Sequence, residues 1–157
     1  WTVAKTLLGD ERLMVSRVAE NKRILARVRR LLKDIGLEDP ALAAKAAQIE
    51  IRLTALEATA LRLLSTFDGG GKVGAEPSML KLQGSQLVQV QDQLLFEIAG
   101  LYGLPLDAES RQTPNLPIYH DTVDMIGSAL FHHRGYTIAG GASEVQRNII
   151  AQQVLGL

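Results

Sequence analysis

The chain has 157 residues, enough for one domain with a hydrophobic core, and its hydrophobic residues (46%) include few aromatics (4%). The net charge is zero, which argues against a nucleic-acid-binding domain. The absence of cysteine excludes a disulfide framework, a thiol nucleophile and a thiolate metal site. No apolar run reaches the roughly 18 residues of a membrane span and no signal peptide is visible, so we expect a cytoplasmic protein without a membrane span.

Two long helices are predicted in the first half of the chain. The first covers residues 3–35, and Gly36 ends it. Asp39 and Pro40 supply an N-cap and a first-turn proline for the second, which runs to about residue 67. The apolar stripe of the first helix is Leu7, Met14, Val18, Leu25, Val28 and Leu32, and that of the second is Leu42, Ala46, Ile49, Leu53, Leu56, Ala60, Leu63 and Phe67.

Three further helices are predicted in the second half. The third covers residues 77–101, a proline-containing loop follows at 103–117, the fourth covers 118–133, and the last starts near Ser143. Long helices with short connections favour antiparallel neighbours. We therefore predict an all-α fold, an up-and-down four-helix bundle with an additional short C-terminal helix. The inward residues are Leu80, Leu87, Val90, Leu94 and Ile98 in the third helix and Val123, Ile126 and Leu130 in the fourth.

Two polar features do not predict a ligand site. The glycine run at 68–72 lacks the spacing of a phosphate-binding loop. His120, His132 and His133 have no metal-ligand spacing with carboxylates, and adjacent histidines on a helix point in different directions. We therefore predict structural or surface roles for the histidines, and no metal site.

The C-terminal segment contains the strongest local signal. Gly140 and Gly141 allow a sharp turn and close approach of a ligand to the backbone. Ser143 is a good N-cap, and Gln146, three residues later, completes a capping-box pattern. The free N–H groups at such a helix start favour an anionic or oxygen-rich ligand. A glycine turn that leads into a capped surface helix is the alternative interpretation.

The whole run GGASEVQRNIIAQQVLGL at 140–157 resembles the C-terminal signature of flavin-dependent acyl-CoA dehydrogenases. Residues 1–12 and 76–84 are also similar to that family. The resemblance implies that residues 1–157 form the family's C-terminal helical domain. Because the chain starts at Trp1, we expect it to be part of a longer protein that also has an N-terminal helical domain and a middle β domain.

Glu11 is the candidate general base. On a regular helix its neighbours at three and four residues are Leu7, Leu8, Met14 and Val15. Burial among them would raise the pKa of the carboxyl and suit it to accept a proton near neutral pH. The alternative is a glutamate at the rim of the stripe that reaches solvent by its flexible stem.

The resemblance favours the catalytic interpretation of Glu11. Most family members carry their catalytic glutamate just before the tail glycine, where this chain has Gly140. A minority carry the base on the first helix of this domain within an L-x-x-E-R motif, which residues 8–12 match. Asp10 is the nearest competitor, but it lies one residue further round the helix.

The resemblance also implies a reaction and a cofactor. Glu11 would remove the α-proton of an acyl-CoA thioester, and the β-hydrogen would leave as hydride to FAD. The backbone N–H of Gly140 would stabilise charge on the thioester oxygen, so Gly140 is the second catalytic candidate. Gly141, Ala142 and Glu144 correspond to residues near the flavin, although Ala142 replaces a hydroxyl-bearing residue. An electron-transfer flavoprotein is the expected electron acceptor.

The sequence departs from the family at two flavin-binding motifs. An R-x-x-F-G motif is absent after the first helix, and residues 97–103 only partly match the segment Q-x-x-G-G-x-G. These departures from the two motifs are compatible with bacterial enzymes of this family in which two different subunits form one flavin site. We therefore expect a homo- or hetero-tetramer. The departures also leave the alternative of a non-catalytic, flavin-poor partner subunit or helical oligomerisation module. Fatty acyl, branched acyl and sterol side-chain thioesters all remain open, and the isolated 157 residues are expected to be inactive.

Overall fold

The computed structural model describes residues 16–35, 38–70, 74–104, 123 and 125–157, and these residues form helices and no strand. The predicted all-α fold with a short C-terminal helix is therefore confirmed. The main helices are α2 (Val18–Ile35), α3 (Pro40–Asp68), α4 (Glu76–Ala99), α6 (Ile126–His132) and α7 (Ser143–Ile150). Shorter helical turns are η1 (Gly100–Gly103), η3 (His133–Thr137) and η4 (Ala151–Leu155).

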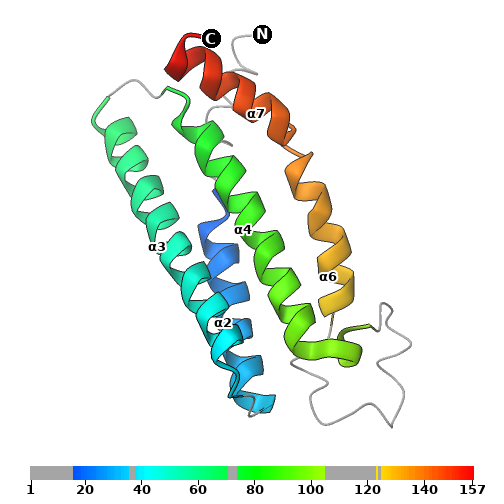
Figure 1. The fold of residues 1–157 in the computed structure, drawn as a ribbon. Coiled ribbons are helices and arrows are strands. Elements are labelled where there is room, and N and C mark those ends of the chain that lie inside the picture. Colours follow the sequence, from blue (N-terminus) through cyan, green and yellow to red (C-terminus); the bar gives the residue numbers. More distant parts are fainter. Residues whose placement is uncertain (1–15, 36–37, 71–73, 105–122, 124) are drawn as a thin grey trace.

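Helix α4 is the centre of the bundle. It packs against α2, α3, α6 and α7, and Figure 1 shows α7 lying across one end of it. Because neighbours cover α4 on several sides, both its apolar and many of its polar side chains are buried. The hydrophobic core that these helices share consists of Leu25, Val28, Leu31, Leu42, Ile49, Leu53, Leu56, Leu63, Leu80, Leu87, Leu94, Leu95, Ile98, Ala99 and Ile126.

Helix α3 follows the sequence prediction closely. The Asp39 side chain accepts a hydrogen bond from the Ala41 N–H at 2.7 Å, and Pro40 occupies the first helical position, so the predicted cap is confirmed. The predicted inward position of Phe67 is wrong, because its side chain is 52% exposed. All residues from 64 to 70 are exposed, which shows that the core ends at Leu63.

The prediction of one continuous helix over residues 3–35 is wrong at residues 16 and 17. Ser16 lies in a turn, and Arg17 has a φ of 51°, a left-handed value that an α-helix does not contain. The break coincides with a close approach to α4: a Cβ on Gly84 would lie 2.1 Å from the Ser16 carbonyl oxygen. Residues 3–15 and Gly36 lie outside the described residues.

A buried amide stabilises this break. The Asn21 side chain, which is fully buried, donates hydrogen bonds to the carbonyls of Arg17 (2.9 Å) and Gly84 (3.2 Å). Gln91 of α4 in turn donates to the Asn21 side-chain oxygen at 2.6 Å. Asn21 therefore compensates for the lost helical bonds at the start of α2 and fixes its end against α4.

The fourth predicted helix is shorter than expected. Met125 has a φ of 62°, and α6 begins only at the next residue, Ile126. Ile126 is buried as predicted, and Val123 and Leu130 are partly buried. Residues 118–122 and 124, which the prediction included in this helix, lie outside the described residues.

Gly84→Ala is expected to destabilise the protein by about 1–3 kcal/mol, because the new methyl group would push the Ser16 backbone away from α4. Gly135→Ala is the matched control, since a Cβ there meets nothing within 4 Å. Urea unfolding of both variants measures the difference. Equal stabilities would show that the Ser16–Gly84 contact does not constrain the fold.

Candidate functional site

The predicted diglycine turn forms a sharp bend between η3 and α7. Gly140 has a φ of 70° and Gly141 a φ of 101°, which are left-handed values that favour glycine. A Cβ on Gly141 would lie 2.3 Å from the side-chain nitrogen of Gln146, whereas a Cβ on Gly140 would meet nothing within 4 Å. The backbone conformation of Gly141 therefore favours glycine, whereas the flexible end of Gln146 can move away from a Cβ, and Gly140 borders open space.

Buried side chains hold both carbonyl groups of the bend. The Lys81 ammonium, from α4, donates to the Gly141 carbonyl oxygen at 2.5 Å. The Gln146 side chain, from α7, donates to the Gly140 carbonyl at 3.4 Å. Lys81 is only 2% exposed, although it is a residue type that rarely lies in a protein interior. The central helix therefore fixes the bend through a charge-assisted hydrogen bond.

The predicted capping box at the start of α7 is wrong. Ala142, with φ −56° and ψ 150°, occupies the cap position without a side-chain hydrogen bond, and Ser143 is the first helical residue. The Ser143 hydroxyl donates instead to the Thr137 carbonyl at 3.3 Å, and Gln146 turns back to Gly140. The two side chains predicted to cap the helix, Ser143 and Gln146, therefore bond to backbone carbonyls of residues 137 and 140, which precede the helix.

Glu144 lies in the first turn of α7 beside the bend. Its side chain is 79% exposed and lies 3.6 Å from the Arg147 guanidinium. Burial lowers the pKa of Lys81, and Arg17 adds to this effect, whereas the Glu144 carboxylate opposes it. Glu144 is therefore within electrostatic range of Lys81 but free to meet a ligand from solvent.

A second polar cluster connects the start of α2 to η3. The Arg17 guanidinium stacks on the Tyr136 ring at 3.4 Å from its centroid and forms an ion pair with Glu20 at 2.7 Å. The Tyr136 hydroxyl donates to Glu20 at 3.1 Å. Burial, followed by the Glu20 carboxylate, raises the pKa of Tyr136. This cluster fixes η3, and η3 leads directly into the bend.

Asp92 of α4 anchors η3 from the other side. Its carboxylate lies 2.7 Å from Nδ1 of His133, and burial raises its pKa while the bond to His133 opposes that shift. His132 is exposed. Among the described residues there is no group of three His, Asp or Glu side chains able to hold a metal ion. His120 lies outside the described residues.

The predicted site residues fall into two groups. Gly140, Gly141, Ala142 and Glu144 are contiguous in the bend and the first turn of α7. Glu11 lies outside the described residues, as does its competitor Asp10. Lys81 was not predicted from the sequence, although small and polar residues recur at three-, four- and seven-residue spacing along α4, as Ser78, Lys81, Ser85 and Asp92.

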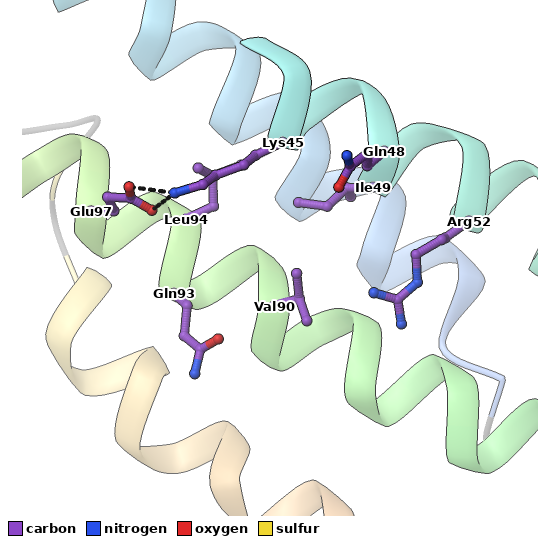
Figure 2. A pocket seen from close by; sticks show the side chains of 8 residues that line it. All are labelled: Lys45, Gln48, Ile49, Arg52, Val90, Gln93, Leu94 and Glu97. Atoms are coloured by element: carbon purple, nitrogen blue, oxygen red, sulfur yellow. Dashed lines mark hydrogen bonds and ion pairs between the residues drawn. The ribbon is translucent and has the colours of Figure 1, made fainter. Parts of the chain in front are cut away.

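A separate groove of about 280 Å³ lies between α3 and α4 (Figure 2). Its apolar lining is Ile49, Val90 and Leu94, and an ion pair of Lys45 and Glu97 at 2.5 Å spans it. Glu97 is the first residue of the segment that partly matches a flavin-binding motif, and the ion pair occupies its carboxylate. None of the predicted tail residues lines this groove. No described helix is both long enough and apolar enough to span a membrane.

The lowered pKa of Lys81 predicts how stability changes with pH. In the folded protein Lys81 loses its proton below its ordinary value of 10.5, so the unfolded chain binds more protons between the two values. The free energy of unfolding should therefore rise with pH across this interval, relative to Lys81→Met. Urea unfolding of both proteins between about pH 8 and pH 10.5 measures the difference. Lys22→Met controls for the loss of one exposed lysine. If the free energy of unfolding of the wild type, relative to that of Lys81→Met, falls as pH rises, the expected direction is contradicted.

Comparison with known proteins agrees with this architecture. The family model "Acyl-CoA dehydrogenase, C-terminal domain" matches residues 1–155. Among solved structures, a variant of the Tcur3481–Tcur3483 steroid ACAD is similar, with a TM-score of 0.81 and 22% sequence identity over 100% of this chain. This chain spans 40% of the length of that one, and the similarity at this identity concerns the fold. A search of the curated proteins found no match. The match over nearly every residue shows that the chain belongs to the acyl-CoA dehydrogenase family, as its C-terminal helical domain.

Proposed function

We propose that this chain is the catalytic C-terminal domain of a flavin-dependent acyl-CoA dehydrogenase, which converts an acyl-CoA thioester to the 2-enoyl-CoA. The observation that carries the proposal is the bend at Gly140 and Gly141, whose carbonyls are both held from inside the protein. No acceptor among the described residues bonds to the N–H groups of Gly140, Gly141 or Ala142. These donors are available for an oxygen-rich ligand.

Gly140 is the proposed donor to the thioester oxygen. Its N–H is a backbone group and persists without the glutamate side chain that most family members have at this position. The open space beside Gly140 is compatible with a ligand that approaches the backbone closely. The bend therefore supplies charge stabilisation, and another residue must supply the base.

The tail residues also fit a flavin. Gly141 and Ala142 would hold FAD by backbone donors, and the exposed Glu144 carboxylate could accept hydrogen bonds from it. Ala142 has no hydroxyl, so this chain offers one side-chain contact fewer than a serine or threonine would. FAD, when bound, would supply the two-electron acceptor that the protein side chains lack.

Glu11 is the proposed base, and the contacts of Arg17 with residues at the bend support this proposal. Arg17, only six residues later in the chain, acts electrostatically on Lys81 and stacks on Tyr136. Lys81 contacts Gly141 directly, and Tyr136 precedes Gly140 by four residues. Six residues span at most about 21 Å, so the proposed position of Glu11 beside the bend is compatible with the length of chain that joins it to Arg17.

The proposed reaction balances with these groups. The Glu11 carboxylate would take the α-proton, the electron pair of that C–H bond would form the α,β double bond, and the β-hydrogen would leave with its electron pair. FAD, when bound, would supply the acceptor for that hydride. Bend donors stabilise the negative charge that develops on the thioester oxygen. We propose an electron-transfer flavoprotein as the acceptor that reoxidises the cofactor, and a cytoplasmic location.

We further propose a homo- or hetero-tetramer. Large apolar side chains are exposed on α3 and at the C-terminal end, and such surfaces are frequent at subunit contacts. The similar solved structure is named for two polypeptides and a steroid, so a two-subunit enzyme and a sterol side-chain thioester are candidates here as well. The apolar side chains concerned are Ile51, Leu61, Val154, Leu155 and Leu157.

Glu11→Gln in the full-length enzyme is expected to lower kcat by about 10²–10⁴ while flavin content stays unchanged, because an amide cannot accept the α-proton. Asp10→Asn is the matched control and should retain activity. Reduction of an artificial electron acceptor with an acyl-CoA, at equal flavin content, measures the effect. Full activity of the Glu11 variant would disprove its role as the base.

The missing R-x-x-F-G motif favours the alternative, a flavin-poor partner subunit or oligomerisation module. A visible absorption spectrum separates the two functions. The catalytic proposal predicts flavin bands in the full-length protein, purified alone or with a paralogue encoded beside it. A colourless protein that assembles with the paralogue, in a complex whose flavin and activity survive Glu11→Gln, would establish the alternative.

A further inference from the structure

We infer that Lys81 is a positioning residue for the ligands of the bend: it orients the peptide group between Gly141 and Ala142, and it places a positive charge behind the bend, where the neighbouring Gly140 N–H is the proposed donor to the thioester. This inference rests on the proposed function and adds to it a residue outside the tail. Lys81 is not a catalytic residue in the sense of touching the substrate, because its ammonium contacts the inner side of the bend.

The geometry of the peptide bond determines what this contact does. A peptide group is planar and trans, so its C=O and N–H point in opposite directions. The carbonyl of Gly141 points to Lys81, and the N–H of Ala142 in the same peptide therefore points away from α4. The bond from Gln146 to the Gly140 carbonyl orients the N–H of Gly141 in the same manner. Two consecutive donors are thus fixed by side chains from two different helices.

Lys81 also polarises the peptide that it holds. A hydrogen bond from a cation to a carbonyl withdraws electron density from the peptide and strengthens its N–H as a donor. The positive charge lies inside the protein, where solvent screens it less than at the surface. The polarised N–H is that of Ala142, which is assigned to the flavin. The positive charge also favours a ligand oxygen at Gly140 that becomes more negative, as a thioester oxygen does when the α-proton leaves.

The Lys81 charge has no partner ion among the described residues. No carboxylate among the described residues lies within ion-pair distance of Lys81, and its one described acceptor is the Gly141 carbonyl. A buried charge without a partner ion is costly, and an apolar side chain of similar length often maintains or improves stability. The described structure therefore gives the Lys81 charge one contact, the bend itself.

The test uses the complete flavin-loaded enzyme, with its partner subunit if it has one, and the variants Lys81→Met and Lys81→Arg. The probe is acetoacetyl-CoA, whose α-protons ionise readily, and its bound ionisation is followed by ultraviolet absorbance as pH is varied. Lys81→Met should raise the pKa of the bound probe by about one unit and lower kcat about tenfold with little change in KM. Lys81→Arg should have a probe pKa and a kcat close to those of the wild type, since it keeps the positive charge.

Two controls separate this effect from general damage. Lys22→Met removes an exposed lysine and should leave the probe pKa and kcat unchanged. Amide hydrogen exchange should show that the core of α4 remains as protected in Lys81→Met as in the wild type. If Lys81→Met fails to fold, Lys81→Gln gives the same comparison with a neutral polar side chain.

The outcomes distinguish the inference from the proposed function. If the wild-type enzyme is active and Lys81→Met has the same probe pKa and the same kcat, the role of Lys81 is overturned. The proposed dehydrogenase function then still stands. The same holds if Lys81→Arg is as impaired as Lys81→Met, because the charge would then not matter. A wild-type protein that holds no flavin and binds no acyl-CoA would overturn both.

Discussion

The hydrogen bond between the Lys81 ammonium and the Gly141 carbonyl connects the central helix of this domain to the segment that we propose as its functional site. Helix α4 packs against the other main helices, so a side chain that projects from it has little freedom. The bend at Gly140 and Gly141 has the opposite property, because glycines restrict the backbone least. The side chain of Lys81, which projects from this helix, therefore fixes the conformation of the glycine bend. As a result, the N–H groups of the bend have a defined orientation.

The polar interior of the bundle serves the same purpose at three points. Asn21 and Gln91 fix the break at the start of α2, Asp92 holds His133, and Arg17 stacks on Tyr136. Each contact joins segments that are far apart in the sequence but lie near the segment that follows Glu11 or the segment that precedes Gly140. Apolar packing gives the bundle its shape, and these directional contacts fix the start of α2 and η3 against α4.

The sequence predicted those parts of the fold that depend on local physics. The periodicity of Leu42, Ile49, Leu53 and Leu56, with the cap at Asp39, was sufficient to define α3. The break at Arg17 could not be predicted, because it depends on a backbone contact with Gly84, far away in the chain. Lys81 was missed for a related reason: a lysine in an amphipathic pattern is usually solvated, and only the tertiary position of α4 buries it. The diglycine bend was predicted, but the side chains that hold it come from α4 and from a glutamine first interpreted as part of a cap. The role of Glu11 stays a prediction.

A crystal structure of the complete enzyme with FAD and an unreactive acyl-CoA thioether analogue tests the central claim most directly. Our account predicts the Glu11 carboxylate within about 3–3.5 Å of the atom that represents the substrate α-carbon. It also predicts the acyl oxygen of the analogue within hydrogen-bond distance of the Gly140 N–H, with Lys81 still bonded to the Gly141 carbonyl. A Glu11 carboxylate in bulk water, with the acyl group bound away from the diglycine bend, would contradict it.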